Sequence, residues 1–153
     1  MKVAISSDHA GFEIKEYVKQ LLRERGYEIL DFGGDVEEPG DDYPDRAYPA
    51  AKAVRDGEAA FGVLVCGTGI GIAMAANKVR GIRAAPCRTP GEAALARQHN
   101  NANILCLRGR PPDREQTLAI LEQWLSASFQ GGRHARRIAK IRDIEIAEGG
   151  ARG

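Results

Sequence analysis

The sequence predicts an α/β fold in which helices cover both faces of a mostly parallel sheet of five strands. Its 153 residues suit a single domain. Hydrophobic residues make up 43% of the chain and charged residues 28%, which is the composition of a globular domain and not of a disordered or fibrous chain. Short apolar runs alternate with segments of helical periodicity, and this alternation is typical of a parallel sheet with helices on both sides.

The predicted elements follow one another in regular order. Residues 2–6 form an apolar run, residues 8–11 supply a turn, and apolar side chains then recur at helical spacing from Phe12 to Leu22. Further strands are predicted at 28–32, 61–66, 82–85 and 104–107, and further helices at 45–55, 71–78, 90–99 and 112–128. A last helix at 133–147 has no strand after it, so we expect it to pack on a second subunit. We expect one domain over residues 1–148 and a flexible tail at 149–153.

Apolar patterning and cysteine usage exclude several classes of protein. No apolar run approaches the roughly 18 residues of a membrane span, and Asp8 interrupts the first apolar run too early for a signal peptide. We therefore expect a cytoplasmic protein that does not contact membranes. The three cysteines contain no CxxC pair and the three histidines show no metal-ligand spacing, so we expect free thiols and no bound metal.

Charged residues are unevenly distributed, although 22 Lys and Arg nearly balance 21 Asp and Glu. Seven acids and no base lie between residues 31 and 45; we interpret this run as a solvated loop and assign it no chemistry. Five bases and no acid lie between residues 133 and 142. Among them, Arg133 and Arg137 would share one face of a helix, where they either grip a phosphate together or face solvent. A phosphate monoester fits this patch better than nucleic acid, because no aromatic residues are interleaved with the bases.

The loop from Cys66 to Gly71 is the most informative stretch of the chain. Its glycines let backbone N–H groups approach an oxygen closely, as anion-binding loops do. It is no dinucleotide fingerprint, since Ile72 stands where the third glycine would be, and no GK[ST] motif follows. Cys66 precedes the glycines, so its thiol is either an activated base or nucleophile or an inert buried group. Cys87 and Cys106 lie in or beside apolar strands, and we expect them to fill the core.

Two further sets of polar residues lie at helix ends. Asp8 and His9 follow the first strand, where they either cap the next helix or face a ligand. His99 and Asn100 end a helix, where a histidine is either a partner of the helix dipole or a functional group. The residues alone leave these alternatives open.

Taken in order, the motifs resemble the ribose-5-phosphate isomerase B family, which also includes allose-6-phosphate and galactose-6-phosphate isomerases. The resemblance covers nearly the whole chain. It is carried by Ser7-Asp8-His9-Ala10-Gly11, Asp42-Tyr43-Pro44-Asp45, Cys66-Gly67-Thr68-Gly69-Ile70-Gly71, Ala75-Ala76-Asn77-Lys78, Gly81-Ile82-Arg83-Ala84, Arg97-Gln98-His99-Asn100 and Gly131-Gly132-Arg133-His134 with Arg137. It implies a Rossmann-like three-layer α/β/α sandwich that needs no cofactor and works as a homodimer or dimer of dimers with shared active sites.

The same resemblance implies a role for each matching residue. Cys66 would be the base that moves a proton between C1 and C2 of a sugar phosphate, His99 would open the furanose ring, and Thr68 would share in catalysis. The substrate-binding residues would come from both subunits. One subunit would supply Asp8, His9, Tyr43, Gly67, Gly69, Ile70 and Gly71, and the other would supply Asn100, Arg110, Arg133 and Arg137. Ile72 stands where another branch of the family has a glutamate, which places this chain in the cysteine branch, and Arg108 stands where many members have glycine.

The resemblance thus implies an isomerase of ribose 5-phosphate and ribulose 5-phosphate. An isomerase of a six-carbon sugar phosphate is an alternative, because the two substrates differ by one hydroxymethylene group. A hydrolase with Cys66 as nucleophile and His99 as its base is another. The last is a sugar-phosphate-binding module without catalysis.

Overall fold

The structure is a computed structural model that describes residues 1–33 and 39–149. Its described part holds a five-stranded sheet with the order β2-β1-β3-β5-β4, and every strand pairing is parallel. The strands are β1 (Lys2–Ser7), β2 (Glu28–Asp31), β3 (Phe61–Cys66), β4 (Ala84–Pro86) and β5 (Ile104–Arg108). The predicted α/β fold is confirmed, and the sheet that we expected to be mostly parallel is parallel throughout.

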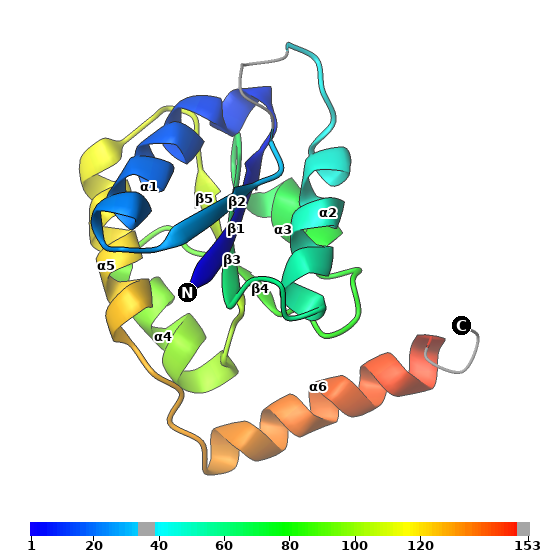
Figure 1. Ribbon diagram of the computed structural model, residues 1–153. Helices are drawn as coiled ribbons and strands as arrows, with labels where there is room; N and C mark the ends of the chain where they lie inside the picture. Colours follow the sequence, from blue (N-terminus) through cyan, green and yellow to red (C-terminus); the bar gives the residue numbers. More distant parts are fainter. Residues whose placement is uncertain (34–38, 150–153) are drawn as a thin grey trace.

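Helices cover both faces of the sheet (Figure 1). One face carries α1 (Phe12–Glu24), α4 (Pro90–Asn100) and α5 (Arg114–Ser126), and the other carries α2 (Tyr43–Arg55) and α3 (Ile70–Ala76). Side chains alternate along each strand between the two cores: Val3 and Ile5 pack under α1, whereas Ala4 packs under α2.

Several bounds differ from the predicted ones for local reasons. The Asn77 side chain turns back and hydrogen-bonds the N–H and the carbonyl of Ala84, at 2.7 and 2.9 Å. For this reason α3 ends at Ala76 rather than at residue 78, and β4 begins at Ala84 rather than at residue 82. Helix α5 begins at Arg114 rather than at residue 112, because the side chain of Asp113 caps its first turn.

The last helix, α6 (Arg133–Gly149), extends across the end of the molecule where the strands begin (Figure 1). It includes Gly149, the first residue of the predicted tail; residues 150–153 lie outside the described residues. The Glu145 carboxylate accepts the N–H of Gly81, at 2.9 and 3.1 Å, and clefts of about 810 and 700 Å³ lie between α6 and the rest of the subunit. Large apolar side chains on α6 are exposed in one subunit: Ile141, Ile144 and Ile146. No helix in the described ranges is long and apolar enough to cross a membrane.

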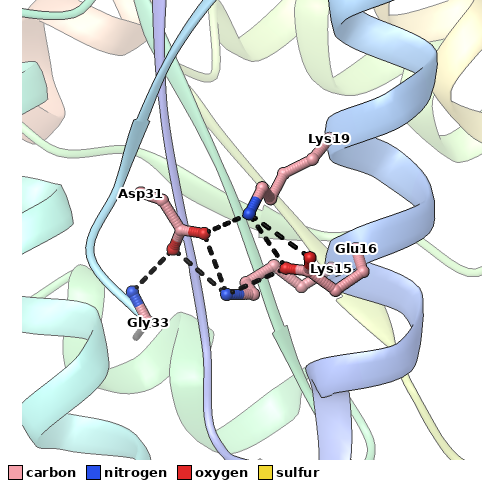
Figure 2. A network of polar contacts seen from close by, with 5 residues as sticks. All are labelled: Lys15, Glu16, Lys19, Asp31 and Gly33. Carbon is pink, nitrogen blue, oxygen red and sulfur yellow. Dashed lines mark hydrogen bonds and ion pairs between the residues drawn. The ribbon is translucent and has the colours of Figure 1, made fainter. Parts of the chain in front are cut away.

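A buried charge network joins α1 to the end of β2 (Figure 2). The Lys15 side chain has no exposed surface, and its Nζ lies 3.1 and 3.0 Å from the two carboxylate oxygens of Asp31. Nζ of Lys19 lies 2.7 Å from the same carboxylate, the N–H of Gly33 donates to it at 2.8 Å, and Glu16 pairs with both lysines. Burial alone would raise the pKa of Asp31, but the hydrogen bonds from Lys19, Gly33 and Lys15 together lower it. The expectation of a solvated acid is therefore wrong for Asp31.

Replacing Asp31 with asparagine should lower the free energy of unfolding by about 3 kcal/mol, because it leaves the buried Lys15 charge without its main partner. The folded-state pKa of Asp31 is lowered, so this stability is present above the ordinary value of 3.8 and is lost as the pH falls through the folded-state pKa. Urea unfolding of both proteins at neutral and acidic pH measures the two effects. The control is Glu16→Gln, which removes a half-exposed carboxylate from the same network and should cost less than about 1 kcal/mol. Equal losses in the two variants would contradict the assignment.

Candidate active site

The strand order places the switch point of the sheet between β1 and β3. The chain passes from β1 outward to β2 and then crosses to β3 on the other side of β1. Ligands of open α/β sheets bind beyond the carboxyl ends of the strands at such a point. The segments that leave β1, β3 and β5 there contain Asp8 and His9, the loop from Cys66 to Gly71, and Arg110.

Two glycines allow these three segments to touch one another. A Cβ at Gly11 would lie 2.5 Å from the carbonyl oxygen of Val65, and a Cβ at Gly109 would lie 2.6 Å from that of Ala10. Neither neighbour can move cheaply, since both are backbone atoms of packed segments. Backbone hydrogen bonds join the segments. The N–H of Asp8 donates to the carbonyl of Val65 at 3.3 Å, that of Gly109 to the carbonyl of Cys66 at 2.8 Å, and that of Arg110 to the carbonyl of Gly67 at 3.1 Å.

Cys66 lies at the end of β3 with its side chain almost fully buried, at 4% exposure. The N–H of Gly69 donates to its sulfur at 3.2 Å. Gly69 has a φ of +79°, which glycine adopts without strain, and this conformation turns the loop back over the thiol. The hydroxyl of Thr68 accepts the N–H of Ile70 at 3.1 Å, so its own proton is available for another acceptor.

The other two cysteines have a different environment. Cys87 belongs to the core under α4 and Cys106 to the core under α3, and both are buried. Burial raises the pKa of Cys87 to about 12 and that of Cys106 well above its ordinary value. The prediction that these two residues fill the core is confirmed.

Asp8 is a capping residue. Its carboxylate accepts the N–H of Gly11 at 3.1 Å and so caps the short 3-10 helix His9–Gly11. Burial raises the pKa of Asp8, while the hydrogen bond from Gly11 opposes that rise. The capping role that we weighed for Asp8 is thus present, and the buried carboxyl stands next to the segment that holds His9.

His9 is held by Asp41, a residue 32 positions further along the chain. One oxygen of Asp41 accepts both the backbone N–H and Nδ1 of His9, each at 2.8 Å. The other oxygen accepts Nε of Arg46 at 2.9 Å. The hydrogen bond to Asp41 raises the pKa of His9; burial would raise the pKa of Asp41, but its bonds to His9 and Arg46 lower it. The predicted solvated acidic loop is therefore wrong for Asp41 as well, whereas residues 34–38 of that loop lie outside the described residues.

Tyr43 forms one wall of the loop that follows Cys66. It is the first residue of α2, and its ring lies so close to Gly71 that a Cβ there would be 2.8 Å from Cζ. Glycine at position 71 is therefore required for this contact, which leaves the tyrosine 40% exposed beside the loop. The structure thus brings Tyr43 together with the loop, as the resemblance implies.

The remaining predicted site residues lie at the opposite end of the sheet. Helix α4 runs back from the carboxyl ends of the strands, so His99 and Asn100 stand close to the start of β5. The ring of His99 stacks on that of His134, with centroids 4.2 Å apart and 9° between the planes. His134 is buried, and burial together with the nearby charges lowers its pKa. Arg133 and Arg137 are exposed on the same end of α6.

Arg110 departs from the grouping that the resemblance implies. Its backbone N–H bonds the carbonyl of Gly67, and its positive charge lowers the pKa of His9, so it lies on the Cys66 side of the molecule. Asn100, Arg133 and Arg137 lie at the other end. In a site formed by two subunits, Arg110 would therefore come from the subunit that supplies Cys66, and not from the one that supplies Asn100.

The described residues contain no group of three or more His, Cys, Asp or Glu side chains that could hold a metal ion. The Cys66 side offers a buried thiol, a loop of backbone N–H groups, the Thr68 hydroxyl and two basic side chains, His9 and Arg110. Such an arrangement suits proton transfer next to an oxygen that becomes negative.

Comparison with known proteins shows the family of this chain. The family described as Ribose/Galactose Isomerase matches residues 3–141. The chain belongs to this family. It is 44% identical over 144 residues to ribose-5-phosphate isomerase B of Escherichia coli (strain K12), with 94% of this chain and 96% of the relative covered.

Solved structures of the Ribose/Galactose Isomerase family have the same fold. The structure of ribose-5-phosphate isomerase B from Clostridium thermocellum is 48% identical with a TM-score of 0.93, and the match covers 96% of this chain and 99% of that one. The structure of ribose-5-phosphate isomerase B from Mycoplasma genitalium has ribulose-5-phosphate bound. It is 42% identical with a TM-score of 0.90, and the match covers 94% of this chain and 95% of that one.

Sequence reasoning missed three residues of this family member: Asp41 and His134, which contact the predicted site residues His9 and His99, and Arg46, which contacts Asp41. Asp41 was set aside with the other acids of its run, because nothing in the local sequence links it to His9. Arg46 follows Asp41 at five positions, a spacing that no helical pair rule covers here, since Asp41 precedes α2. His134 was noted among the bases of α6, but its stacking on His99 depends on how α6 meets α4.

Replacing Gly109 with alanine should lower the free energy of unfolding by about 1–3 kcal/mol, the usual cost of overpacking. The added Cβ would lie 2.6 Å from the Ala10 carbonyl oxygen and would push the β5 segment away from Cys66. Gly91→Ala is the matched control, because a Cβ there lies 3.9 Å from the nearest atom, the Thr89 hydroxyl oxygen, in the first turn of α4. Urea unfolding compares the two variants. If Gly109→Ala is as stable as Gly91→Ala, the close approach does not constrain the site.

Proposed function

We propose that this chain interconverts ribose 5-phosphate and ribulose 5-phosphate through an enediolate. The observation that carries the proposal is the placement of Cys66 at the switch point, under the N–H of Gly69, in a chain matched over nearly its whole length by ribose-5-phosphate isomerases B. The similarity to a structure with bound ribulose-5-phosphate supports the same substrate.

In this proposal Cys66 is the base. Its thiolate takes the proton from C2 of the open-chain aldose, and the electron pair forms the C1–C2 double bond of an enediolate. A proton then passes from the C2 oxygen to the C1 oxygen, and Cys66 returns its proton to C1 to give the ketose. A positioned base of this kind contributes about 10²- to 10⁴-fold to the rate. The backbone N–H groups of residues 67–71 stabilise the oxygen that becomes negative, and the Thr68 hydroxyl donates a hydrogen bond to the same oxygen.

His99, Asn100, Arg133 and Arg137 join this site from a second copy of the chain. Support comes from their position at the end of the subunit opposite Cys66 and from the exposed isoleucines of α6, which a partner would cover. His99 then opens the furanose ring by moving a proton from the C1 hydroxyl to the ring oxygen. Arg133 and Arg137 bind the phosphate, whose binding energy holds the sugar in register with Cys66.

Incubating the protein with ribose 5-phosphate and following ribulose 5-phosphate tests the activity directly, with allose 6-phosphate and galactose 6-phosphate in parallel reactions. Cys66→Ala should lower kcat by about 10²- to 10⁴-fold with little change in KM, because the thiolate acts in the transition state. Cys87→Ala is the matched control and should keep most of the activity at some cost in stability. Near-normal turnover of Cys66→Ala would show that the base is elsewhere, and faster turnover of a six-carbon substrate would replace the proposed substrate.

Mixed dimers test whether the site is shared. If Cys66→Ala and Arg137→Ala proteins, each inactive, are unfolded, mixed equally and refolded, half of the dimers should contain one chain of each kind. In each mixed dimer one site has both defects and the other has neither, so about a quarter of all sites become normal. Activity should therefore reappear from two inactive parents. If mass spectrometry detects mixed dimers and activity stays at the parental level, Cys66 and Arg137 serve one site within a single chain.

A further inference from the structure

We propose that Asp41 is a positioning residue that holds His9 in one orientation through its backbone N–H and its Nδ1, so that His9 and Arg110 together bind the anionic part of the substrate. The inference rests on the proposed function, in which that anionic part is the phosphate of the sugar. It assigns a role to a residue of the acidic run that the sequence did not connect with the site.

The orientation follows from the hydrogen bonds. A carboxylate can only accept, so the His9 nitrogen that faces Asp41 at 2.8 Å, Nδ1, carries a proton. The same oxygen accepts the backbone N–H of His9, which fixes the imidazole relative to its own main chain. Nε2 is then the ring nitrogen directed away from Asp41. Arg46 holds the second oxygen of Asp41, so the carboxylate cannot rotate without losing a charge-assisted hydrogen bond.

The charge state of His9 is set by four groups from different segments. Asp41 lies before α2, and its hydrogen bond raises the pKa of His9; Asp8, on the same turn as His9, acts in the same direction. Arg110, on the segment after β5, lowers it. Arg46, on α2, pairs with Asp41 and keeps that carboxylate ionised, since its hydrogen bond lowers the pKa of Asp41. The hydrogen bond to Asp41 outweighs burial, which would lower the pKa of His9, and the net effect raises this pKa above its ordinary value of 6.5.

A protonated histidine beside an arginine is an arrangement that an anion stabilises. The His9 side chain is 28% exposed and that of Asp41 only 14%, so the imidazolium reaches the surface while its partner is largely covered. Arg110 is exposed. An anionic ligand next to both cations would remove their mutual repulsion, and the imidazolium would contribute a charge-assisted hydrogen bond to it.

The decisive variant is Asp41→Asn. Its amide oxygen can still accept both N–H groups of His9, so the hydrogen bonds that orient His9 are kept, while the negative charge and the contact with Arg46 are lost. His9 should then titrate at a lower pH than in the wild type, as measured by NMR of the labelled imidazole. KM for ribose 5-phosphate near neutral pH should rise about tenfold, the loss expected when a charge-assisted hydrogen bond becomes a neutral one, with kcat nearly unchanged.

The pH dependence separates this role from a structural one. The wild-type His9 stays protonated above its ordinary pKa of 6.5, so binding weakens only as the pH rises through the raised value, and in Asp41→Asn it weakens earlier. The ratio of the two KM values should therefore be largest between the two pKa values and smaller at lower pH, where His9 is protonated in both proteins. Protonation of the substrate phosphate is common to both and cancels. A purely structural role predicts a ratio that is the same at every pH.

Two further variants complete the experiment. Asp41→Glu restores a carboxylate and should recover the wild-type pH dependence even where its KM is uniformly higher; it also provides the test if Asp41→Asn does not fold. Glu122→Gln removes an exposed carboxylate of α5 that pairs with Arg25, the residue after α1. Both lie on the face of the sheet opposite α2, so the variant should leave the His9 titration and KM unchanged.

Each outcome has one meaning. An unchanged His9 titration in Asp41→Asn overturns the inference, as does a constant KM ratio. A fall in kcat at constant KM also overturns it, because His9 would then transfer a proton in the reaction. If the wild type does not isomerise ribose 5-phosphate, the proposed function fails separately. The inference is then still decided by the NMR titration and by the binding of inorganic phosphate to the wild type and to Asp41→Asn.

Discussion

The close approach of three backbone segments at the carboxyl ends of β1, β3 and β5 is the constraint on which the site depends. A Cβ at Gly11 or Gly109 would lie 2.5 or 2.6 Å from a neighbouring carbonyl oxygen, so the turns are in direct backbone contact. This contact places the turn with Asp8 and His9 and the segment with Arg110 on either side of the loop that begins at Cys66. Chemistry-bearing side chains therefore converge because the main chains that carry them cannot be further apart without breaking their shared hydrogen bonds.

The acidic run between residues 31 and 45 also holds segments of the chain together. Asp31, at its start, pairs with the buried Lys15 of α1, and Asp41, beyond the undescribed residues, pairs with His9. Both sides of the run are thus tied by ionic hydrogen bonds to the first strand–helix unit of the chain. A cluster of like charges that would repel in isolation is stabilised because individual acids have cationic partners elsewhere in the fold.

The sequence was sufficient for the layered architecture, because strand and helix periodicities alternate without a break and only a parallel sheet accommodates that order. It also located the loop after Cys66 and the turn at Asp8. It could not find the partners of Asp31 and Asp41, since those contacts join residues 16 and 32 positions apart with no local pattern. The position of His99 could have been predicted. A helix that connects two parallel strands must run back to the N-terminal ends of the strands, so the end of α4 with His99 lies away from Cys66 within one chain.

This separation has an energetic consequence for the proposed enzyme. The start of α6 carries Arg133, Arg136 and Arg137, which repel one another and lie far from the acids that hold His9. In the composite site a phosphate would contact these arginines of one subunit and the His9 and Arg110 cations of the other. A ligand that binds both subunits of an assembled dimer stabilises the dimer by the free energy of that binding, and the assembly in turn completes the site. One anion that contacts cations of both subunits would thus couple substrate binding to the association of the chains.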